Sequence, residues 1–559
     1  MVLVHTFFWR CCGLYARRFI HKILEISMCQ RKAEETFFSE QNSRLSKAHL
    51  ASFDGPHIPS ATAKPKSFGA LGLHPPIVSA LRTAFPTIRN PTKNQAILIP
   101  ALLEGRDIFL QDRTGSGKSF GVVLGLLNKP RAKGKPRITS IFIVPHRELA
   151  HQLYGWVERM FAPAASIPSS SISLIAQVLV RDSQGSGLNL LRESPPHILF
   201  STPQALMDAW REQPDALQLK SIQTIVADEA DYLIPTIDYG TSRKRKLMKQ
   251  RQHAGETQQF LDLVYGNNTR LIADEDRPPE RDSPQLIISS ATLPTHLVDY
   301  VSEESGWIDR DNWVSISGAS SESRARQPKS EVMHSVLVAS DDHVRNIAGA
   351  LPSRPSFGAD TAASTEKDYE EPIPEMDPAL VESEPPQSKR PDMSLIHCPG
   401  YMQTASPFNP LALETIAMIF AADVPSTALL VIPSTAPVRR AIFELRRVGV
   451  DAHGLDLLKK RSSDHGAVRA NPTLLVSTWA NTRGLDVRDL SHVFVLGVPS
   501  GGTTTYVHIA GRVGRLESTG TRRAGRIVMV VGPEEEDAAR ELLQSIKCDA
   551  TELHVEMQL

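Results

Sequence analysis

A glycine-rich stretch near residue 115 has the residue types needed to hold a nucleotide phosphate. Residues 111–120 read QDRTGSGKSF, and Gly117, Lys118 and Ser119 are in register with the phosphate-loop template G-x-x-x-x-G-K-[ST]. In such a loop the backbone amides surround the phosphates, the lysine faces their charge and the hydroxyl reaches a magnesium ion. Asp112 stands where a small residue is expected. The stretch therefore predicts phosphate binding, with one exception to explain.

Two carboxylates farther along the chain could complete this chemistry. Asp228 and Glu229 lie in TIVADEADYL, where the tetrapeptide DEAD follows a short apolar run. The aspartate can hold Mg²⁺ and the glutamate can orient an attacking water, because hydrolysis of a phosphoanhydride depends mainly on positioning and charge neutralisation. Taken alone, the tetrapeptide is equally typical of an ordinary polar strand end.

The phosphate loop needs a strand before it and a helix after it, since amides at a helix start face the anion. DIFLQ precedes the loop and FGVVLGLL follows it. Other β-branched or apolar runs end in polar residues in the same way, as buried parallel strands do. They predict a doubly wound α/β domain with its ligands at the carboxyl ends of the strands. The runs are residues 107–111, 140–145, 197–203, 224–231 and 285–292.

The pattern repeats in the second half of the chain without another phosphate loop. Strand-like runs occur at residues 428–435, 473–480, 492–499 and 525–532, and AIFELRRVG has apolar residues at helical spacing. A second α/β domain with no nucleotide loop suggests one ATP shared across an interface. Its polar clusters should then complete the first domain's site from outside.

Further clusters arrive in a fixed order along the chain. They are NPTKNQ (90–95), PHRELAHQ (145–152), the DEAD tetrapeptide, SSATLP (289–294), TRGLDV (482–487) and HIAGRVGR (508–515). With these motifs the chain resembles the DEAD-box RNA helicases from about Phe68 to Gly532. The resemblance implies two tandem RecA-like doubly wound parallel-sheet domains joined by a linker, with ATP and Mg²⁺ as ligands.

The resemblance implies roles for residues on the ATP side. Lys118, Asp228, Glu229, Arg512 and Arg515 match the catalytic set, in which the two arginines are fingers that stabilise charge on the γ phosphate. Ser119 and Asp228 match the magnesium-binding pair. Gln95, whose amide offers a donor and an acceptor to a base edge, matches the adenine-reading residue, with Phe68 upstream. The remaining ATP-binding matches are Thr114, Gly115, Ser116, Gly117, Lys118, Ser119 and, for the ribose, Asp486. The matches for interdomain coupling are Asp231, Ser290, Thr292 and His508.

The RNA side departs more from the family pattern. The matching residues are Pro145, Arg147, Thr202, Pro203 and Thr478. The departures are His146 for a threonine, Gln204 and Ala205 where an arginine-containing motif is expected, Trp479 for an aspartate and Ile509 for an arginine. Each lost cation should weaken salt-dependent RNA binding. Contacts to backbone and 2′-hydroxyls would be largely independent of sequence.

Asp112 has two interpretations at this stage. Its carboxylate could accept hydrogen bonds from local amides, or it could repel a bound phosphate. Because the lysine, the hydroxyl and both catalytic carboxylates are retained, we expect a tolerated variation at the edge of the loop and not a dead site.

An acidic, proline-rich segment separates the two halves of the chain. Residues 360–392 hold ten acidic and three basic residues, a local charge of −7 in a chain of net charge zero, and residues 351–392 hold eight prolines. Such a segment cannot bury enough apolar surface to fold. The expected organisation is a tail at 1–50, an ATP-binding domain at 68–318, a disordered acidic linker or insertion at 351–392, and a C-terminal RecA-like domain at 411–545.

The compartment stays open between two interpretations. The first residues carry Arg10, Arg17, Arg18 and Lys22 with no acid before Glu25, which is the basic, acid-poor, amphipathic character of a mitochondrial presequence. A disordered or partner-binding tail is the alternative. RKRKLMKQR at residues 243–251 could instead be a nuclear or nucleolar signal, or a solvated insertion. The five cysteines are scattered and no apolar run is long enough to cross a bilayer, so we expect a membrane-free, reduced protein.

The sequence thus favours an ATP-dependent RNA helicase or RNA-remodelling enzyme, with the mitochondrial branch that assists ribosome assembly as the nearest guess. The competing hypothesis is a weakly hydrolysing, ATP-gated RNA clamp or assembly scaffold, which the missing cations favour and the retained catalytic set opposes. A DNA translocase is a distant third. The expected partners are RNA and ribosomal or other RNP proteins, and we expect a monomer.

Overall fold

The computed structural model describes residues 67–131, 135–161, 172–181, 187–236, 254–268, 283–318, 332–352, 401, 403–455, 472–487, 490–513 and 525–553 of the 559-residue chain. All of them belong to one unit of the fold, Ser60–Leu559. The basic tail at 1–50, the cluster at 243–251, most of the acidic segment and Arg515 lie outside the described residues.

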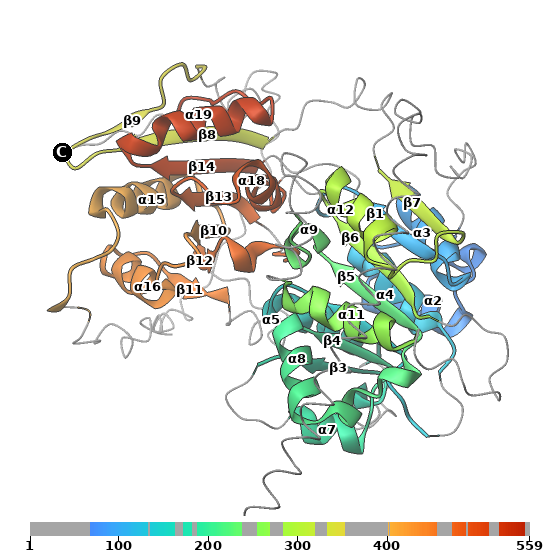
Figure 1. The fold of residues 1–559 in the computed structure, drawn as a ribbon. Coiled ribbons are helices and arrows are strands. Elements are labelled where there is room, and N and C mark those ends of the chain that lie inside the picture. The colour runs from blue at the N-terminus through green and yellow to red at the C-terminus, as the bar shows by residue number, and fades with distance from the viewer. Residues whose placement is uncertain are drawn as a thin grey trace, which may run out of the picture. The chain divides into compact units, whose positions relative to one another are not determined.

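Seven strands among the described residues form the first sheet, in the order β3-β4-β2-β5-β6-β1-β7, and all neighbouring strands are parallel (Figure 1). Chain order and sheet order differ, as they do in a doubly wound sheet. The strands are β1 (Asp107–Gln111), β2 (Ser140–Ile143), β3 (Ala176–Leu179), β4 (Ile198–Ser201), β5 (Thr224–Asp228), β6 (Gln285–Ser290) and β7 (Trp313–Ser317).

Helices cover both faces of this sheet. Alternate residues of each strand point to opposite sides, and the apolar side chains on both sides need to be buried. In β1, Ile108 and Leu110 enter one hydrophobic core and Phe109 enters the other. The first core is closed by α2 (Pro75–Ala84), α3 (Lys93–Leu103), α4 (Lys118–Asn128) and α5 (Arg147–Phe161). The second is closed by α7 (Gly187–Glu193), α8 (Pro203–Glu212), α9 (Ala230–Leu233), α11 (Glu256–Asn268) and α12 (Thr295–Asp299). Short helical turns are η2 (Phe68–Leu71), η3 (Pro214–Leu217), η4 (Leu219–Ser221) and η5 (Tyr300–Glu304).

The carboxyl ends of the parallel strands fix the order of the motifs along one edge of the sheet. The phosphate loop follows β1, PHRELAHQ follows β2 and Thr202 follows β4. SSATLP begins with the last two residues of β6, and DEAD begins with the last residue of β5. The ATP-associated motifs are therefore neighbours at β1, β6 and β5, and the RNA-associated motifs lie beyond them at β2 and β4.

A second sheet has the order β11-β12-β10-β13-β14-β8-β9, parallel except for the antiparallel pair β8-β9 (Figure 1). Its cores contain residues of α15, α16, α18 and α19. The elements are β8 (Val332–Ala339), β9 (Val344–Asn346), α15 (Pro410–Asp423), β10 (Thr427–Ile432), α16 (Val438–Arg447), β11 (Ala452–Gly454), β12 (Thr473–Thr478), η8 (Ala480–Thr482), β13 (Leu490–Leu496), α18 (Gly502–Ala510), β14 (Gly525–Val531), η9 (Pro533–Glu535) and α19 (Glu536–Ser545). The predicted architecture of two doubly wound parallel-sheet domains is confirmed.

The boundary expected for the second domain needs a correction. β8 pairs with β14 along its whole length and β9 pairs with β8, yet both strands precede residues 351–392. The second domain therefore begins at Val332 and not at residue 411. The acidic segment is flanked on both sides by elements of this domain, so it interrupts the domain, and residues 318–331 connect the two sheets.

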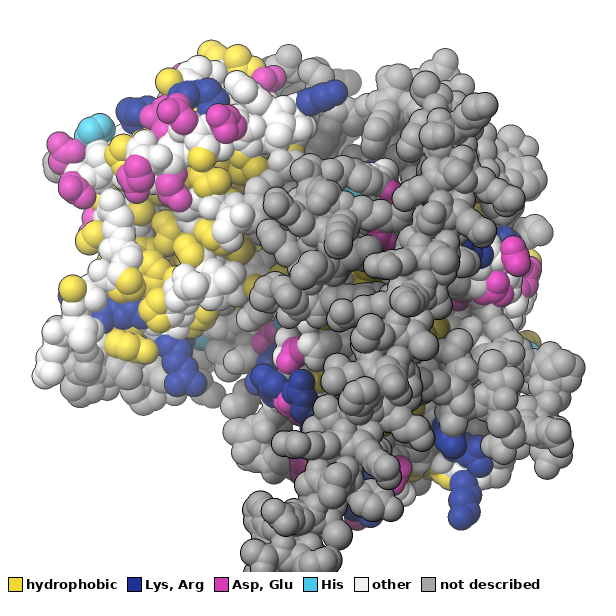
Figure 2. Space-filling view, in the orientation of Figure 1, with side chains coloured by type: hydrophobic (Ala, Val, Ile, Leu, Met, Phe, Trp, Pro, Cys, Tyr) yellow, Lys and Arg dark blue, Asp and Glu magenta, His cyan; other side chains and the backbone are white. Residues whose placement is uncertain are grey.

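The surface over α19 and β9 carries intermixed charge. Figure 2 shows acidic and basic side chains side by side at the top left of the view. Arg345 pairs with Glu536, and Arg540 pairs with Asp537 at 2.6 Å. Basic side chains on this face are therefore paired with acidic neighbours. Within the described residues, no helix has the length and apolar character that spanning a bilayer would require.

Candidate functional site

The phosphate loop links β1 to α4 in the predicted strand, loop, helix order. Gly117 ends the loop with φ of 86°, a left-handed conformation that favours glycine, and directly precedes the helix start at Lys118. The ammonium of Lys118 is buried and donates to the backbone carbonyls of Asp112 at 2.5 Å and Arg113 at 2.9 Å. Burial lowers the pKa of this lysine. The loop thus holds the Lys118 ammonium against its own backbone carbonyls, and phosphate binding by this cation stays a prediction.

Gln95 connects the start of α3 to this loop. Its side-chain oxygen accepts from the Thr92 amide at 2.9 Å, and its side-chain nitrogen donates to the Gly117 carbonyl at 2.9 Å. A Cβ at Gly117 would come within 2.7 Å of this nitrogen, and one at Gly121 would lie 3.0 Å from Gln95 Cγ. Glycine is therefore needed where the two helices cross. Adenine reading by Gln95 stays a prediction, as does the role of Phe68, which is buried in the core.

Asp112 accepts hydrogen bonds from its surroundings. One carboxylate oxygen lies 2.5 Å from Asn94 Nδ2 and the other accepts from the Arg113 amide at 2.8 Å. A Cβ on Gly318 would lie 2.2 Å from the carboxylate, so the side chain fits tightly against that backbone. These contacts support the first of the two interpretations, in which Asp112 satisfies local amides.

We expect Asp112→Ala to lower the free energy of unfolding of the first domain by about 1–3 kcal/mol, because two hydrogen bonds to a charged acceptor are lost. Asp112→Asn keeps an acceptor and should lose less. Urea unfolding of the purified variants measures this, with Asp208→Ala, which removes an exposed carboxylate, as the control. Tighter ATP binding in both Asp112 variants at unchanged stability would favour the phosphate-repelling interpretation instead.

Ser119 and Asp228 form a donor set that fits a magnesium ion. Ser119 Oγ donates to Asp228 Oδ2 at 2.5 Å, and the aspartate is buried at the end of β5. Burial, and next the negative charge of Glu229, raise the pKa of Asp228 to about 6. A hydroxyl beside a buried carboxylate is the kind of hard-oxygen site that Mg²⁺ takes while keeping several waters. These are therefore the residues that would hold the ion.

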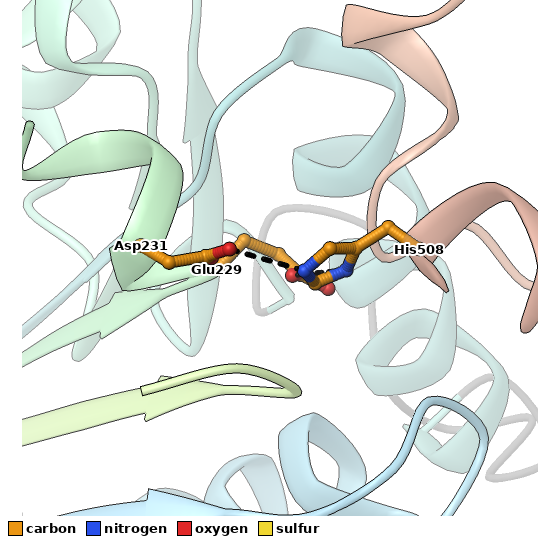
Figure 3. A group of neighbouring side chains, drawn as sticks. All are labelled: Glu229, Asp231 and His508. Atoms are coloured by element: carbon orange, nitrogen blue, oxygen red, sulfur yellow. Dashed lines mark hydrogen bonds and ion pairs between the residues drawn. The ribbon is translucent and has the colours of Figure 1, made fainter. Parts of the chain in front are cut away.

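Glu229, Asp231 and His508 form one buried charge cluster (Figure 3). Glu229 and Asp231 come from the β5–α9 junction, where Glu229 has φ of 58°, and His508 comes from α18 of the second domain. His508 Nδ1 lies 3.0 Å from Glu229 Oε2, and its Nε2 lies 3.1 Å from Asp231 Oδ2. The two domains thus meet through a histidine between two carboxylates.

The pKa of each group in this cluster depends on two opposing effects, burial, which favours the neutral form, and pairing with an opposite charge, which favours the charged form. Burial alone would raise the pKa of Glu229, but the charge of His508, its hydrogen bond and the charges of Lys118 and Arg512 together outweigh burial and lower that pKa to about 2. Burial likewise opposes the charged form of His508, yet the two carboxylates raise its pKa. Asp231 also accepts from Ser290 Oγ at 2.6 Å and Thr292 Oγ1 at 2.7 Å. Burial opposes its charged form, but His508 first, then the charge of Arg483 and the Ser290 hydroxyl, lower the pKa of Asp231. The four residues expected to couple the domains are therefore in one network.

Arg512 follows His508 by one helical turn and is also buried. Its guanidinium donates to the carbonyl of His508 at 2.9 Å and to that of Leu485. Its positive charge helps to lower the pKa of both Glu229 and Lys118, which places it beside the site. Thr114 of the phosphate loop donates to the Gly511 carbonyl at 3.1 Å, where a Cβ would clash. The second arginine, Arg515, lies outside the described residues.

The remaining ATP-side prediction, Asp486, has an exposed side chain. Its backbone amide donates to Gln152 Oε1 of α5 at 2.6 Å. The ribose contact stays a prediction.

Sequence reasoning missed Arg483, which lies inside the TRGLDV motif. Its side chain is buried and donates to Asp231 Oδ2 at 3.1 Å and to Thr505 at 3.3 Å. Its guanidinium carbon also lies 5.1 Å from the centre of the Tyr232 ring, at cation–π distance. The position of this arginine inside a recognised motif could have drawn attention to it. Its pairing with Asp231 could not be derived from the sequence, because the two residues belong to different domains.

The residues predicted for RNA binding differ in accessibility. Arg147 is half exposed at the start of α5, next to Pro145, and can meet a phosphate. Thr202 and Pro203 are buried at the start of α8, and Thr478 is buried at the end of β12, where its hydroxyl accepts from the Asn481 amide at 3.4 Å. Their contacts with RNA stay predictions.

The departures from the family pattern also have definite positions. Trp479 and Ile509 are both buried in the same hydrophobic core of the second domain. The family has an aspartate at the first of these positions and an arginine at the second, and this chain has an apolar side chain at both. Neither position therefore leaves a buried charge without its partner. Gln204 and Ala205 lie in the first turn of α8, and Ala205 is buried in the first domain's second core.

Comparison with known proteins matches both domains to helicase families. Residues 92–300 match the DEAD/DEAH box helicase family, and residues 458–517 match the helicase conserved C-terminal domain. ATP-dependent RNA helicase DBP9 of Pyricularia oryzae is 34% identical over 36% of this chain and 31% of its own length. Probable ATP-dependent RNA helicase DDX28 of Homo sapiens is 34% identical over 30% of this chain and 31% of its own length. ATP-dependent rRNA helicase RRP3 of Debaryomyces hansenii is 31% identical over 41% and 43%. The matches span less than half the length of these curated relatives.

Solved structures show the same fold at low sequence identity. S. cerevisiae Dbp5 bound to RNA and ADP BeF3 aligns with a TM-score of 0.54 at 17% identity, over 87% of this chain and 95% of that one. Mss116p bound to ssRNA and AMP-PNP aligns with a TM-score of 0.57 at 16% identity, over 89% and 82%.

Proposed function

We propose, on the premise that this chain belongs to the DEAD-box helicase family, that it is an ATP-dependent RNA helicase or RNA-remodelling enzyme. The observation that carries the proposal is the division of one site between two domains. Lys118, Ser119 and Glu229 lie in the first domain, and Arg512 and His508 lie in the second, with His508 3.0 Å from Glu229. Hydrolysis then requires the domains to close, and RNA that binds both domains can favour closure.

Each residue has a separate task in this reaction. Lys118 neutralises the β and γ phosphates, and Glu229, held ionised, accepts a hydrogen bond from the attacking water and orients it. Arg512 stabilises the charge that develops on the transferred phosphoryl group. A magnesium ion at Ser119 and Asp228 would supply further neutralisation of phosphate charge. Asp231, Ser290, Thr292 and His508 connect the state of this site to domain closure.

RNA is the proposed second substrate. Relatives are named as RNA helicases, and solved structures of the same fold hold RNA. Arg147 is accessible to a phosphate beside β2, away from the ATP-associated strands β1 and β6. Such contacts would be largely independent of sequence, so a specific target, such as ribosomal RNA or an RNP with its proteins, would require other parts of the chain. We propose that the enzyme acts as a monomer.

The test is ATP turnover by the purified protein with and without single-stranded RNA. The proposal expects RNA to stimulate turnover and an equal concentration of single-stranded DNA to have much less effect. RNA binding that depends on ATP without stimulated turnover would favour the alternative, a weakly hydrolysing RNA clamp or assembly scaffold. Equal stimulation by DNA would contradict both.

Mitochondrial localisation is part of the proposal and rests on the basic, acid-poor character of the first residues. Residues 1–50 fused to a fluorescent reporter should direct it to mitochondria, and changing Arg10, Arg17 and Arg18 to glutamate should abolish this, because import sequences depend on positive charge. Fluorescence microscopy with a mitochondrial dye checks both fusions. A nuclear or nucleolar signal from the full-length protein, lost when residues 243–251 are made neutral, would instead support the alternative compartment.

A further inference from the structure

His146 makes a contact between the two domains. Its Nε2 lies 2.6 Å from the backbone carbonyl of Arg483, and only 6% of its side chain is exposed. A carbonyl oxygen can only accept, so Nε2 carries the proton and donates. The other ring nitrogen, Nδ1, lies 3.3 Å from the Leu149 amide and 3.2 Å from Glu148 Oε2. Nε2 remains a donor whether or not Nδ1 is also protonated, so the interdomain bond is available in both ring states.

The same stretch of the second domain is held by the next turn of α5. Gln152 Nε2 donates to the Gly484 carbonyl at 3.3 Å, and Gln152 Oε1 accepts from the Asp486 amide at 2.6 Å. Gly484 has φ of 69°, and a Cβ there would lie 2.4 Å from Leu149 Cδ2. His146, directly before α5, and Gln152 within α5 therefore contact three backbone positions of the second domain, at Arg483, Gly484 and Asp486.

These backbone contacts fix the residue whose side chain reaches the ATP-associated network. Arg483 donates to Asp231 Oδ2 at 3.1 Å, and its guanidinium lies over the Tyr232 ring. Its carbonyl is held by His146. A shift of the backbone at Arg483 would thus move a charge that pairs with a buried carboxylate of the DEAD motif.

We propose that His146 is a positioning residue, which holds the Arg483–Asp486 backbone against α5 and so sets Arg483 on Asp231 when the domains close. The inference rests on the proposed function and adds a contact that favours closure without RNA. The position where a threonine was expected beside RNA is occupied by a side chain that is buried against the other domain, whereas its neighbour Arg147 is half exposed. His146 thus serves domain closure, and Arg147 remains for the nucleic acid.

The test compares His146→Gln, whose amide can place a donor near the position of Nε2, with His146→Asn and His146→Ala, which cannot. ATP turnover is measured over a range of poly(U) RNA concentrations. We expect the Asn and Ala variants to need about three- to tenfold more RNA for half-maximal stimulation, the effect of one net hydrogen bond. Maximal turnover at saturating RNA should change less than twofold, and the Gln variant should stay near the wild type. His343→Ala, in an exposed turn of the second domain, is the matched control.

A second measurement does not depend on activity. Dyes introduced by unnatural amino acids at Thr83 of α2 and at the exposed Val448 report the distance between the domains by energy transfer. The closed population without RNA should fall in the Asn and Ala variants and be retained in the Gln variant. Unchanged RNA dependence and unchanged energy transfer in Asn and Ala would overturn the proposal, and so would a Gln variant that behaves like Ala. A wild type with no RNA-stimulated turnover would contradict the proposed function, and energy transfer alone would then decide the role of His146.

Discussion

Arg512→Ala is expected to lower RNA-stimulated ATP turnover by about 10³- to 10⁵-fold, the effect of an arginine finger in related phosphoryl transfer. The guanidinium is buried beside Glu229 and is held by carbonyls of its own domain, so it is placed before the nucleotide arrives. ATP affinity should change only modestly, because Lys118, Ser119 and the phosphate loop supply most ground-state contacts. Steady-state turnover and binding of a fluorescent ATP analogue measure the two effects separately.

The control for this variant is Arg440→Ala. Arg440 is equally buried, donates to Tyr401, Thr404 and Glu444, and lies in α16, away from the ATP-associated residues. Its loss should lower the unfolding temperature while turnover per folded molecule is retained. If Arg512→Ala behaved in the same way, the arginine would be a structural residue of the second domain and the shared site would be wrong.

Glu229→Gln is expected to lower ATP turnover by about 10²- to 10⁴-fold, the usual range for a group that handles a proton in the transition state. The amide keeps the shape of the side chain but loses the carboxylate that His508 holds ionised. ATP should still bind and RNA should still associate in its presence. Single-turnover hydrolysis and RNA binding by fluorescence anisotropy check the two statements.

The glutamine also weakens the ion pair with His508, and RNA binding separates the two consequences. Loss of water positioning alone leaves ATP-dependent RNA binding intact, whereas loss of domain closure lowers it together with turnover. Glu444→Gln, which changes a carboxylate paired with Arg440 outside the site, is the matched control. Undiminished turnover in Glu229→Gln would remove the catalytic role from this residue.

The fold could be predicted from the sequence because its strands are buried on both faces. β1, β5 and β6 each appear as short apolar runs that end in polar residues, and the structure places their ends at one edge of the sheet. β8 was missed because VMHSVLVA precedes the acidic segment, and composition alone assigned it to neither domain. Pairing with β14 decides its domain, and strand pairing between distant segments has no local signal.

The site could be predicted as a set of residues but not as a set of contacts. The resemblance to the helicase family identified His508 and Asp231, yet the distance between them depends on how two domains meet. His146 was visible as a departure from a motif, and only the structure shows that its ring reaches Arg483. The structure also shows a contact that was not predicted from the sequence, in which Gln95 and Leu102 of α3 lie against Gly117, Gly121 and Gly125 at the start of α4 and within it.

Because the acidic segment lies within the second domain, it is not the connection that limits the distance between the two domains. Residues 353–400 begin and end in the same domain, so their length does not set how far the two sheets can separate. The tether is the run of 14 residues, 318–331, which lies between Ser317 and Val332 and spans at most about 50 Å when fully extended. A tether this short keeps each domain at an effective concentration on the order of millimolar around the other. Contacts as weak as single hydrogen bonds can then shift the balance between open and closed states.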